Sequence, residues 1–476
     1  MDVDLNVDLL TELDGLGMFE RLMFKKVELW VVLLMVMFGT IATLLFGWAT
    51  LSAATGENLS GRLGLYALRI ASIPNPAMEW ILGRKKLAPQ LINFDEFDTL
   101  KPYAEDNPSA PFILVSAYSD RYDVATAYLY DLKINKKVYE WVPPVDVINK
   151  LSSQDGEIKT LCCGDYITDK ALYGTQHPYL MPDGSIIFSS GEGPLVRLNR
   201  CNKVEWVINR HFHHSINMGP NGNLFVPIIA NLNTSYKALY GPETHNFLLR
   251  DDGFAEVSPA GKILNEWPIA RVLIQNGYGG LLLGVGRYEE DKIHLNDAKP
   301  ILEGDHYVEK GDVMLSMRNL SSIALFRPST GKIIWLQTGP WLNQHDVDYR
   351  GDGKFVLFGN DSVRFGWRDF ESLRGYSTIY QYDMRSGQAS ELLKLKKYGI
   401  DSVTEGRQQY LPDGSLFIES TEQGVLYLLN SDGSIAWKYV SSTHSRGKIG
   451  ALHWSRVIPR AFGERVLKHI GERRCS

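Results

Sequence analysis

An uncharged, apolar stretch near the start of the chain, Leu29 to Ala54, is the clearest feature of the hydrophobic pattern. A helix needs about 20 apolar residues to cross the hydrocarbon core of a bilayer, and this stretch is longer than that. Trp30 and Trp48 lie near its ends, where indole rings favour the membrane interface. The alternative, a cleaved signal peptide, would have a shorter apolar run that starts nearer the terminus. The pattern therefore predicts a single retained transmembrane helix over residues 29–54.

The basic residues before this stretch predict its orientation. Arg21, Lys25 and Lys26 form a tight cluster directly before the span, and cytoplasmic flanks are enriched in such residues. Residues 1–28 would then be cytoplasmic. Their apolar residues recur at roughly helical spacing, which predicts either an amphipathic helix on the membrane or a partner, or a continuation of the anchor. We expect the rest of the chain outside the cytoplasm, which is the periplasm in a Gram-negative bacterium.

A β-rich pattern repeats along most of the remaining chain. Residues 55–110 are interrupted by prolines and predict a connector with short helical pieces. After them, a glycine-containing turn, two strands, a polar turn and a further strand recur together, and Asp-Gly or Asn-Gly between apolar runs is a strong hairpin signal. The six copies cover residues 112–142, 181–208, 219–269, 310–337, 350–395 and 411–440. Five copies carry a Trp near the end of the last strand, namely Trp141, Trp206, Trp267, Trp335 and Trp437.

These repeats predict the fold class. Six copies of several short strands are typical of an all-β, six-bladed β-propeller, whose blades stack around an axis because no blade can bury its faces alone. A β-sandwich is the alternative, but it would not repeat a Trp at the same turn. We expect the propeller over residues 111–460 and a C-terminal tail over residues 461–476. Whether the run from Gly447 closes the ring with a strand stays open.

Composition narrows the function classes. The chain has 476 residues and a net charge of −5, from 50 basic and 55 acidic residues, which argues against a nucleic-acid binder. The four cysteines fit no zinc spacing. Either of the adjacent Cys162 and Cys163 is a candidate to pair with Cys201, which leaves Cys475 near the terminus.

Histidines recur at one phase of the repeat, just before a turn. They are His177, the run of His211, His213 and His214, then His294 and His345. The innermost strands of a propeller line its channel, so residues of the same phase converge although they are far apart in sequence. A single such histidine is more often structural, but the shared phase predicts a functional cluster. Arg318 and Arg364 follow strands of the same copies, and guanidinium groups suit sulfate, phosphate or carboxylate oxygens, although a surface ion pair is the alternative for each.

At these residues the chain resembles the arylsulfotransferase family, bacterial six-bladed propellers that move a sulfuryl group between phenols without a nucleotide sulfate donor. The resemblance covers roughly residues 110–460. Its motifs here are HHSINMGPNGN with His214, His294-Leu-Asn296 followed by SMRNLSS with Arg318, and NQHDVDYRGDGKFVLFGND with His345. The chain departs from the family at Ser215, where an acidic residue is usual, and in an insertion that reads ILEGDHYVEKG.

The resemblance implies roles for these residues. His345 would attack the sulfur of an aryl sulfate and form a sulfohistidine, and a phenol would then accept the group in a ping-pong scheme. Arg318 and His294 would hold the sulfuryl oxygens, and His214 would orient the group or protonate the leaving oxygen. The expected substrate-binding residues are Asn296, Arg364, His213 and His177, and no metal or other cofactor is implied.

Two other interpretations remain at this stage. A non-catalytic, membrane-anchored propeller would act as a scaffold or binding subunit of a membrane complex, or as a homo-oligomer. A zinc site built from His214, His294 and His345 is the second, but Arg318 would place a positive charge beside the ion. The expected partners of the enzyme are a phenolic sulfate, a phenol and, through one helix, membrane lipid.

Overall fold

The computed structural model describes residues 28–54, 61–72, 91–93, 101–103, 109–152, 170, 173–243, 248–284, 291–365, 369–443, 447–472 and 475. The chain divides into two compact units, residues 1–87 and 88–476. Each unit is described by itself.

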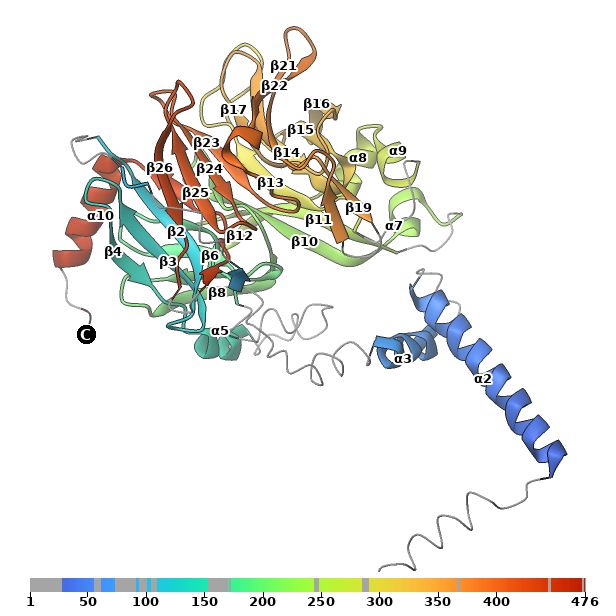
Figure 1. The fold of residues 1–476 in the computed structure, drawn as a ribbon. Coiled ribbons are helices and arrows are strands. Elements are labelled where there is room, and N and C mark those ends of the chain that lie inside the picture. The colour runs from blue at the N-terminus through green and yellow to red at the C-terminus, as the bar shows by residue number, and fades with distance from the viewer. Residues whose placement is uncertain are drawn as a thin grey trace, which may run out of the picture. The chain divides into compact units, whose positions relative to one another are not determined.

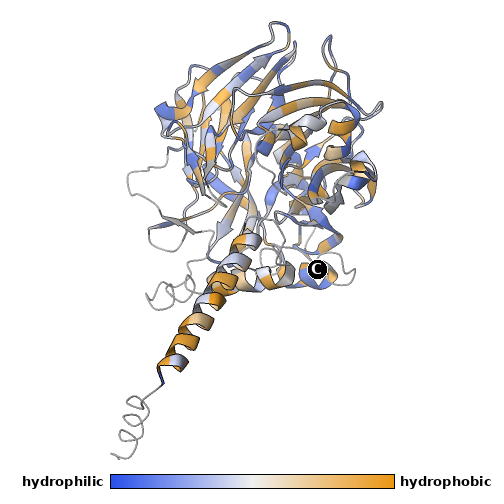
Figure 2. Cartoon of the chain, turned by 90° about the vertical axis from the view of Figure 1, so that its right-hand side faces the viewer, coloured by the Kyte–Doolittle hydropathy of each residue, from blue (hydrophilic) through white to orange (hydrophobic). Residues whose placement is uncertain are grey.

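The first unit contains the apolar helix. Helix α2 (Leu29–Ala54) has the bounds that the hydrophobic pattern predicts and carries no acidic or basic residue. It is long and apolar enough to cross a membrane over residues 29–52, and most of its large apolar side chains are exposed. Figure 2 shows the hydrophobic colouring of this helix. Helix α3 (Gly61–Ser72) follows. The predicted amphipathic segment before the span lies outside the described residues.

The second unit is an all-β, propeller-like arrangement of antiparallel sheets (Figure 1). Four separate sheets have four strands each. The first consists of β28 (Arg456–Ile458), β2 (Phe112–Ser119), β3 (Val124–Asp131) and β4 (Lys136–Trp141). The second consists of β13 (Leu295–Pro300), β14 (Val313–Met317), β15 (Ser322–Arg327) and β16 (Lys332–Thr338).

The two other four-stranded sheets come from the last third of the chain. One consists of β17 (His345–Tyr349), β18 (Lys354–Gly359), β21 (Thr378–Asp383) and β22 (Gln388–Lys394). A separate hairpin, β19 (Ser362–Phe365) and β20 (Asp369–Ser372), interrupts it in sequence. The other sheet consists of β23 (Arg407–Tyr410), β24 (Leu416–Ser420), β25 (Val425–Leu429) and β26 (Ile435–Val440).

The remaining propeller strands form a single eight-stranded sheet, so the predicted six separate blades are not confirmed. Strands β8 and β10 are joined through one residue pair, Phe212 and Ile228, which makes two neighbouring repeats continuous. The strands are β5 (Gln176–Leu180), β6 (Ile186–Ser189), β7 (Gly193–Leu198), β8 (Val204–Phe212), β9 (Asn217–Met218), β10 (Leu224–Ser235), β11 (Leu248–Val257) and β12 (Ile263–Pro268).

Short helices connect or cap the strands. They are α5 (Val145–Ser152), α7 (Tyr236–Tyr240), α8 (Ile269–Gln275), α9 (Gly279–Leu283) and the 3-10 helices η3 (Arg318–Leu320) and η4 (Leu395–Tyr398). Part of the predicted connector is extended rather than helical, because β1 (Leu91–Asn93) pairs with β27 (Lys448–Gly450).

The repeated tryptophans pack one sheet against the next. Trp267 at the end of β12 stacks on Phe254 of its own sheet and meets Phe326 of the following sheet edge-on. Trp335 stacks on Phe355, and Trp437 contacts Tyr130, in each case across to another sheet. A large ring at the outer edge of a sheet therefore fills the space between neighbouring sheets, which explains why the residue recurs in the sequence.

The C-terminal part of the chain closes the arrangement. Strand β28 pairs with β2, so the last propeller strand completes the sheet that the first one starts. The predicted tail folds as helix α10 (Arg460–Glu472), in which Val466 is buried and Arg460 forms an ion pair with Asp131.

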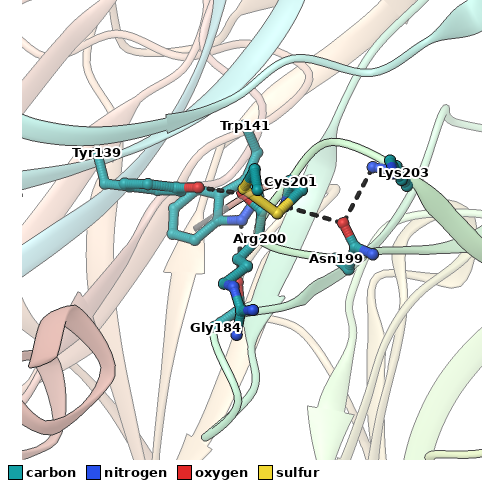
Figure 3. Close-up of a disulfide and its surroundings, with 8 residues drawn as sticks. Tyr139, Trp141, Gly184, Asn199, Arg200, Cys201 and Lys203 are labelled. Atoms are coloured by element: carbon teal, nitrogen blue, oxygen red, sulfur yellow. Dashed lines mark hydrogen bonds between the residues drawn. A yellow bond between two sulfur atoms is a disulfide. The ribbon is translucent and has the colours of Figure 1, made fainter. Parts of the chain in front are cut away.

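A disulfide joins Cys201 to Cys475, which lies just beyond α10 (Figure 3). The expectation that Cys201 pairs with Cys162 or Cys163 is therefore wrong, and those two residues lie outside the described part of the chain. Cys475 reaches Cys201 because α10 packs beside the β5–β6 turn, where Ile470 approaches Gly184, and Arg200 of the β7–β8 turn lies beside the same glycine.

Candidate functional site

The predicted histidines lie at the start of inner strands of different repeats. His345 is the first residue of β17, His294 directly precedes β13, and His177 is the second residue of β5. His214 lies in the short segment between β8 and β9. His177, His214 and His294 all have a positive φ, of 43°, 57° and 49°. Such backbone is strained for residues other than glycine and often marks functional positions.

Four of these histidines form one cluster, which we call the histidine cluster: His213, His214, His294 and His345. The ring of His214 is its centre, with centroid distances of 5.0 Å to His213, 5.1 Å to His294 and 6.2 Å to His345. Trp454, just before β28, contacts both His214 and His345, at 5.9 Å and 5.8 Å. The predicted convergence of His214, His294 and His345 is present in the structure.

The hydrogen bonds of His345 define its tautomer. Asn360 donates through Nδ2 to the carbonyls of Ser402 and Glu405, at 2.7 Å and 2.6 Å, so its Oδ1 faces His345. Nδ1 of His345 lies 2.7 Å from that oxygen and must donate to it. Nε2 therefore carries no proton, and it is buried with no hydrogen-bond partner among the residues that the structure describes.

Burial and charge keep His345 neutral. Its side chain is 0% exposed, and burial followed by the positive charge of Arg318 lowers its pKa well below the usual range. A neutral imidazole with a free Nε2 lone pair is the form of histidine that acts as a nucleophile.

His294 is bound to a carboxylate. Its Nδ1 lies 2.6 Å from Oδ2 of Asp291 and donates to it. Burial and Arg318 lower the pKa of His294, while Asp291 raises it and so opposes both. Among the three converging histidines, His294 alone has such a partner in the described part of the chain. Its protonated form is therefore the best stabilised of the three, which suits proton transfer.

His213 and His214 share a proton. Their Nδ1 atoms are 2.8 Å apart, so one donates and the other accepts. Oδ1 of Asp252 lies 4.0 Å from Nε2 of His213, which is too far for a hydrogen bond. Burial, followed by His213 and His294, lowers the pKa of His214 well below the usual range.

Arg318 supplies positive charge to the cluster. It begins η3, and its backbone N–H donates to the carbonyl of His294 at 3.0 Å. Its Nε donates to Oδ1 of Asn319 at 3.1 Å, and its guanidinium lies 5.1 Å from the ring centroid of Phe370. Its charge lowers the pKa of His214, His294 and His345.

The other predicted site residues contact groups outside the four-histidine cluster. Asn296 is fully buried and donates through Nδ2 to the carbonyl of Gln344, with Oδ1 unpartnered. Nδ1 of His177 accepts from the N–H of Ile216, and its ring packs on Trp454. His211 lies apart, with Nδ1 at 3.0 Å from the carbonyl of Glu192. The side chain of Arg364 lies outside the described residues.

Sequence reasoning missed three neighbours of the cluster: Asp291, Asn360 and Trp454. Asn360 directly follows β18, which pairs with β17 so that His345 faces Phe358, and this hairpin register was a usable signal. Trp454 precedes β28, the strand whose role in closing the ring was left open. Asp291 follows no repeated pattern, so nothing in the sequence pointed to it.

The geometry gives no support to a metal centre. Among the described residues, no group of three or more His, Cys, Asp or Glu side chains is placed to hold a metal ion.

The fold and the cluster define a propeller-like protein with buried imidazoles beside an arginine, and the sequence comparison agrees with that class. Residues 177–442, more than half of the chain, match the model of the family described as arylsulfotransferase (ASST). The chain belongs to this family. No curated protein matches it.

Similar solved structures include two remote ones. A protein of unknown function from Bacteroides caccae is 13% identical, with a TM-score of 0.44, over 73% of this chain and 99% of that one. The Dos1 propeller is 9% identical, with a TM-score of 0.36, over 72% of this chain and 75% of that one.

Proposed function

We propose that this protein transfers a sulfuryl group from a phenolic sulfate ester to a phenol, through a covalent intermediate on His345. The observation that carries the proposal is the buried, unprotonated Nε2 of His345, which has no hydrogen-bond partner among the described residues and is held in that state by Asn360, while the charge of Arg318 lowers the pKa of the ring. Membership of the arylsulfotransferase family supports the same class of reaction.

In the first half-reaction, the lone pair of Nε2 attacks sulfur and an N–S bond forms. The bond between sulfur and the aryl oxygen breaks, and the phenolate leaves with the electron pair. In the transition state the transferring sulfuryl group resembles SO3, so positioning and charge stabilisation matter more than covalent chemistry. Arg318 stabilises the sulfuryl oxygens, and His214 packs against both His294 and His345 and orients the group.

His294 acts as the general acid and general base for the leaving and attacking phenol oxygens. Sequence reasoning gave this role to His214, but the carboxylate of Asp291 stabilises the protonated form of His294 instead. In its protonated form, His294 donates to the departing phenolate. In the second half-reaction it takes the proton of the acceptor phenol, whose oxygen attacks sulfur while the N–S bond breaks and His345 is restored.

We further propose that the arrangement is a ring of six blades around this cluster. The eight-stranded sheet then counts as two blades, β5–β8 and β9–β12, linked by the contact between Phe212 and Ile228. Each of these halves has the four strands of the separate sheets, and inner strands β9, β13, β17 and β23 contact one another in that order.

We propose that α2 is a membrane anchor and that the propeller lies outside the cytoplasm. The uncharged span of residues 29–52 and the basic cluster before it support the anchor and its orientation. The bridge between Cys201 and Cys475 supports an oxidising compartment, because disulfides rarely persist in the cytoplasm.

The reaction is tested with His345→Ala in the full chain, assayed with p-nitrophenyl sulfate as donor and a second phenol as acceptor. Loss of the nucleophile is expected to lower kcat by a factor on the order of 1,000 or more. The control is His306→Ala, which removes an exposed histidine outside the cluster. Retained turnover in His345→Ala, or an inactive parent protein with every aryl sulfate tried, would contradict the proposal.

A further inference from the structure

A polar cavity lies at the far end of the inner strands from the histidine cluster. His294 and His345 stand where β13 and β17 begin, whereas Lys299 and Tyr349 lie near the ends of the same strands. Five residues of strand span about 16 Å, so these ends are well separated from the histidine cluster. A cavity of about 240 Å³ is lined there by Lys299, Tyr349 and residues of β9, β23 and β28, and none of the histidines lines it.

Positive charge dominates this cavity. Its lining includes the cations Lys299, Arg350, Arg407 and Arg456 and one carboxylate, Asp348. Lys299 forms ion pairs with Asp348 and, at 3.5 Å, with Asp346, and Nε of Arg407 lies 3.5 Å from Asp346. Asp297 also interacts with Lys299. Four cations therefore face three carboxylates, which leaves one positive charge in excess.

Arg456 contributes to this excess positive charge from inside the cavity. Its Nη2 donates to the carbonyls of Ile216 and His177, at 2.8 Å and 3.3 Å, and its guanidinium lies 4.8 Å from the ring centroid of Tyr179. Within the described part of the chain no carboxylate forms an ion pair with it, although Asp346 and Asp297 act on its charge at longer range, and its Nε is buried without a hydrogen-bond partner. Burial, and then the charge of Arg407, lower the pKa of Arg456 to about 9. A largely desolvated guanidinium without a directly paired carboxylate is costly, so the cavity favours an anion beside Arg456.

A larger, more apolar cavity adjoins it. This cavity, of about 560 Å³, shares Lys299, Asp348 and Tyr349 with the first one. Its wall is formed by Ile301 to Asp305, the beginning of the insertion that departs from the family pattern. Asp305 fixes this wall, because it accepts hydrogen bonds from the Tyr349 hydroxyl and from the N–H of Asp352.

The two cavities differ in what they offer a ligand. The first offers guanidinium groups and the second offers Pro300, Ile301 and Leu302. Glu303 and Asp305 add negative charge to the second wall, which disfavours a ligand with more than one negative charge.

We propose that these adjoining cavities bind a small organic monoanion, with its oxyanion on Arg456 and Arg407 and a compact apolar body against the inserted segment. Carboxylates and sulfonates share the required chemistry, since both present planar or pyramidal sets of oxygens to guanidinium donors. This site is separate from the histidine cluster and does not depend on sulfuryl transfer.

The test is calorimetric titration of the full chain in detergent with benzoate and with benzenesulfonate, neither of which carries a transferable sulfuryl ester. Saturable binding of at least one probe is expected, and acetate, which lacks the apolar body, is expected to bind at least tenfold more weakly than benzoate. The better probe of the two identifies the preferred oxyanion.

Variants locate the binding. Arg456→Gln should weaken the better probe at least tenfold, and Arg350→Glu at the exposed rim should weaken it severalfold without disturbing buried packing. Arg121→Glu is the matched control, since Arg121 is also exposed and also lies over a tyrosine ring. Arg318→Gln should leave the affinity unchanged.

Three outcomes would overturn the proposal: no saturable binding of either probe, an affinity unchanged in both Arg456→Gln and Arg350→Glu, or loss of binding in Arg318→Gln alone. The last result would assign the anion to the histidine cluster. Because turnover is not the readout, these results are independent of whether the protein transfers a sulfuryl group. A folding defect in Arg456→Gln would show in its circular dichroism, and Arg350→Glu would then decide.

Discussion

At the scale of single residues, the hydrogen bond made by Nδ1 of each imidazole determines what the other ring nitrogen, Nε2, can do. Asn360 is fixed by two carbonyls and so forces the proton of His345 onto Nδ1. Asp291 gives His294 a carboxylate, whereas His345 has only a neutral amide. In the proposed mechanism these similar side chains take different roles, His345 as a neutral nucleophile and His294 as a proton carrier.

The charge of Arg318 gives this assignment a measurable pH dependence. Arg318 lowers the pKa of His345, His294 and His214, so removing its charge stabilises their protonated forms and raises those pKa values. In Arg318→Gln, the acid limb of the kcat/KM profile should therefore move to higher pH by about one unit. The value at the optimum should also fall, because the sulfuryl oxygens lose their cation.

Arg385→Gln is the control for that measurement, since Arg385 is an exposed arginine paired with Asp352 away from the cluster. Its profile should match that of the parent protein. If the acid limb of the Arg318→Gln profile lies at the same pH as that of the parent protein, the charge of Arg318 does not affect the pKa values of the histidines that titrate in the profile.

At the scale of elements, α10 is held to the propeller at both ends. Arg460 at its start pairs with Asp131 and lies 4.0 Å from the ring centroid of Phe112, and Gly463 leaves room for that ring. Cys475 beyond its end is bridged to Cys201. The helix therefore covers the first sheet, where β28 completes the closure.

Removing the bridge should loosen this closure. Cys475→Ser is expected to lower the free energy of unfolding by about 2–4 kcal/mol, measured by urea titration of the oxidised protein. Cys201→Ser should have the same effect, and the double variant should lose no more than either single one, because all three remove the same bond.

The same bridge reports the compartment. In protein taken from cells after free thiols are blocked, Cys201 and Cys475 should be protected from the blocking reagent until a reductant is added. Rapid blocking of both thiols would contradict the proposed location outside the cytoplasm.

At the scale of the whole molecule, the arrangement of sheets brings distant parts of the chain to one place. His214, His294, His345 and Trp454 come from four different sheet regions, yet their rings contact one another. Residues so far apart in sequence come together only in the folded arrangement of sheets. The site therefore depends on the pairing of β28 with β2, which closes this arrangement.

The sequence predicted two kinds of feature in this molecule: the apolar helix, which follows from composition, and the β-rich units, which repeat along the chain. The bounds of α2 follow from an absence of charge, and the tryptophans revealed the repeat because each packs one sheet on the next. The number of separate blades was not predictable, because a single contact between Phe212 and Ile228 merges two of them. Asp291 and the partner of Cys201 come from segments without a repeated pattern, so only the folded chain reveals their neighbours.

The most direct test of the account is to trap the intermediate. The full chain is mixed with p-nitrophenyl sulfate in the absence of an acceptor, quenched rapidly and mapped by mass spectrometry. The account predicts one equivalent of p-nitrophenol released in a burst and one SO3 adduct on the peptide that contains His345, with neither in His345→Ala. Turnover with a second phenol but without an adduct, or an adduct on a residue other than His345, would contradict it.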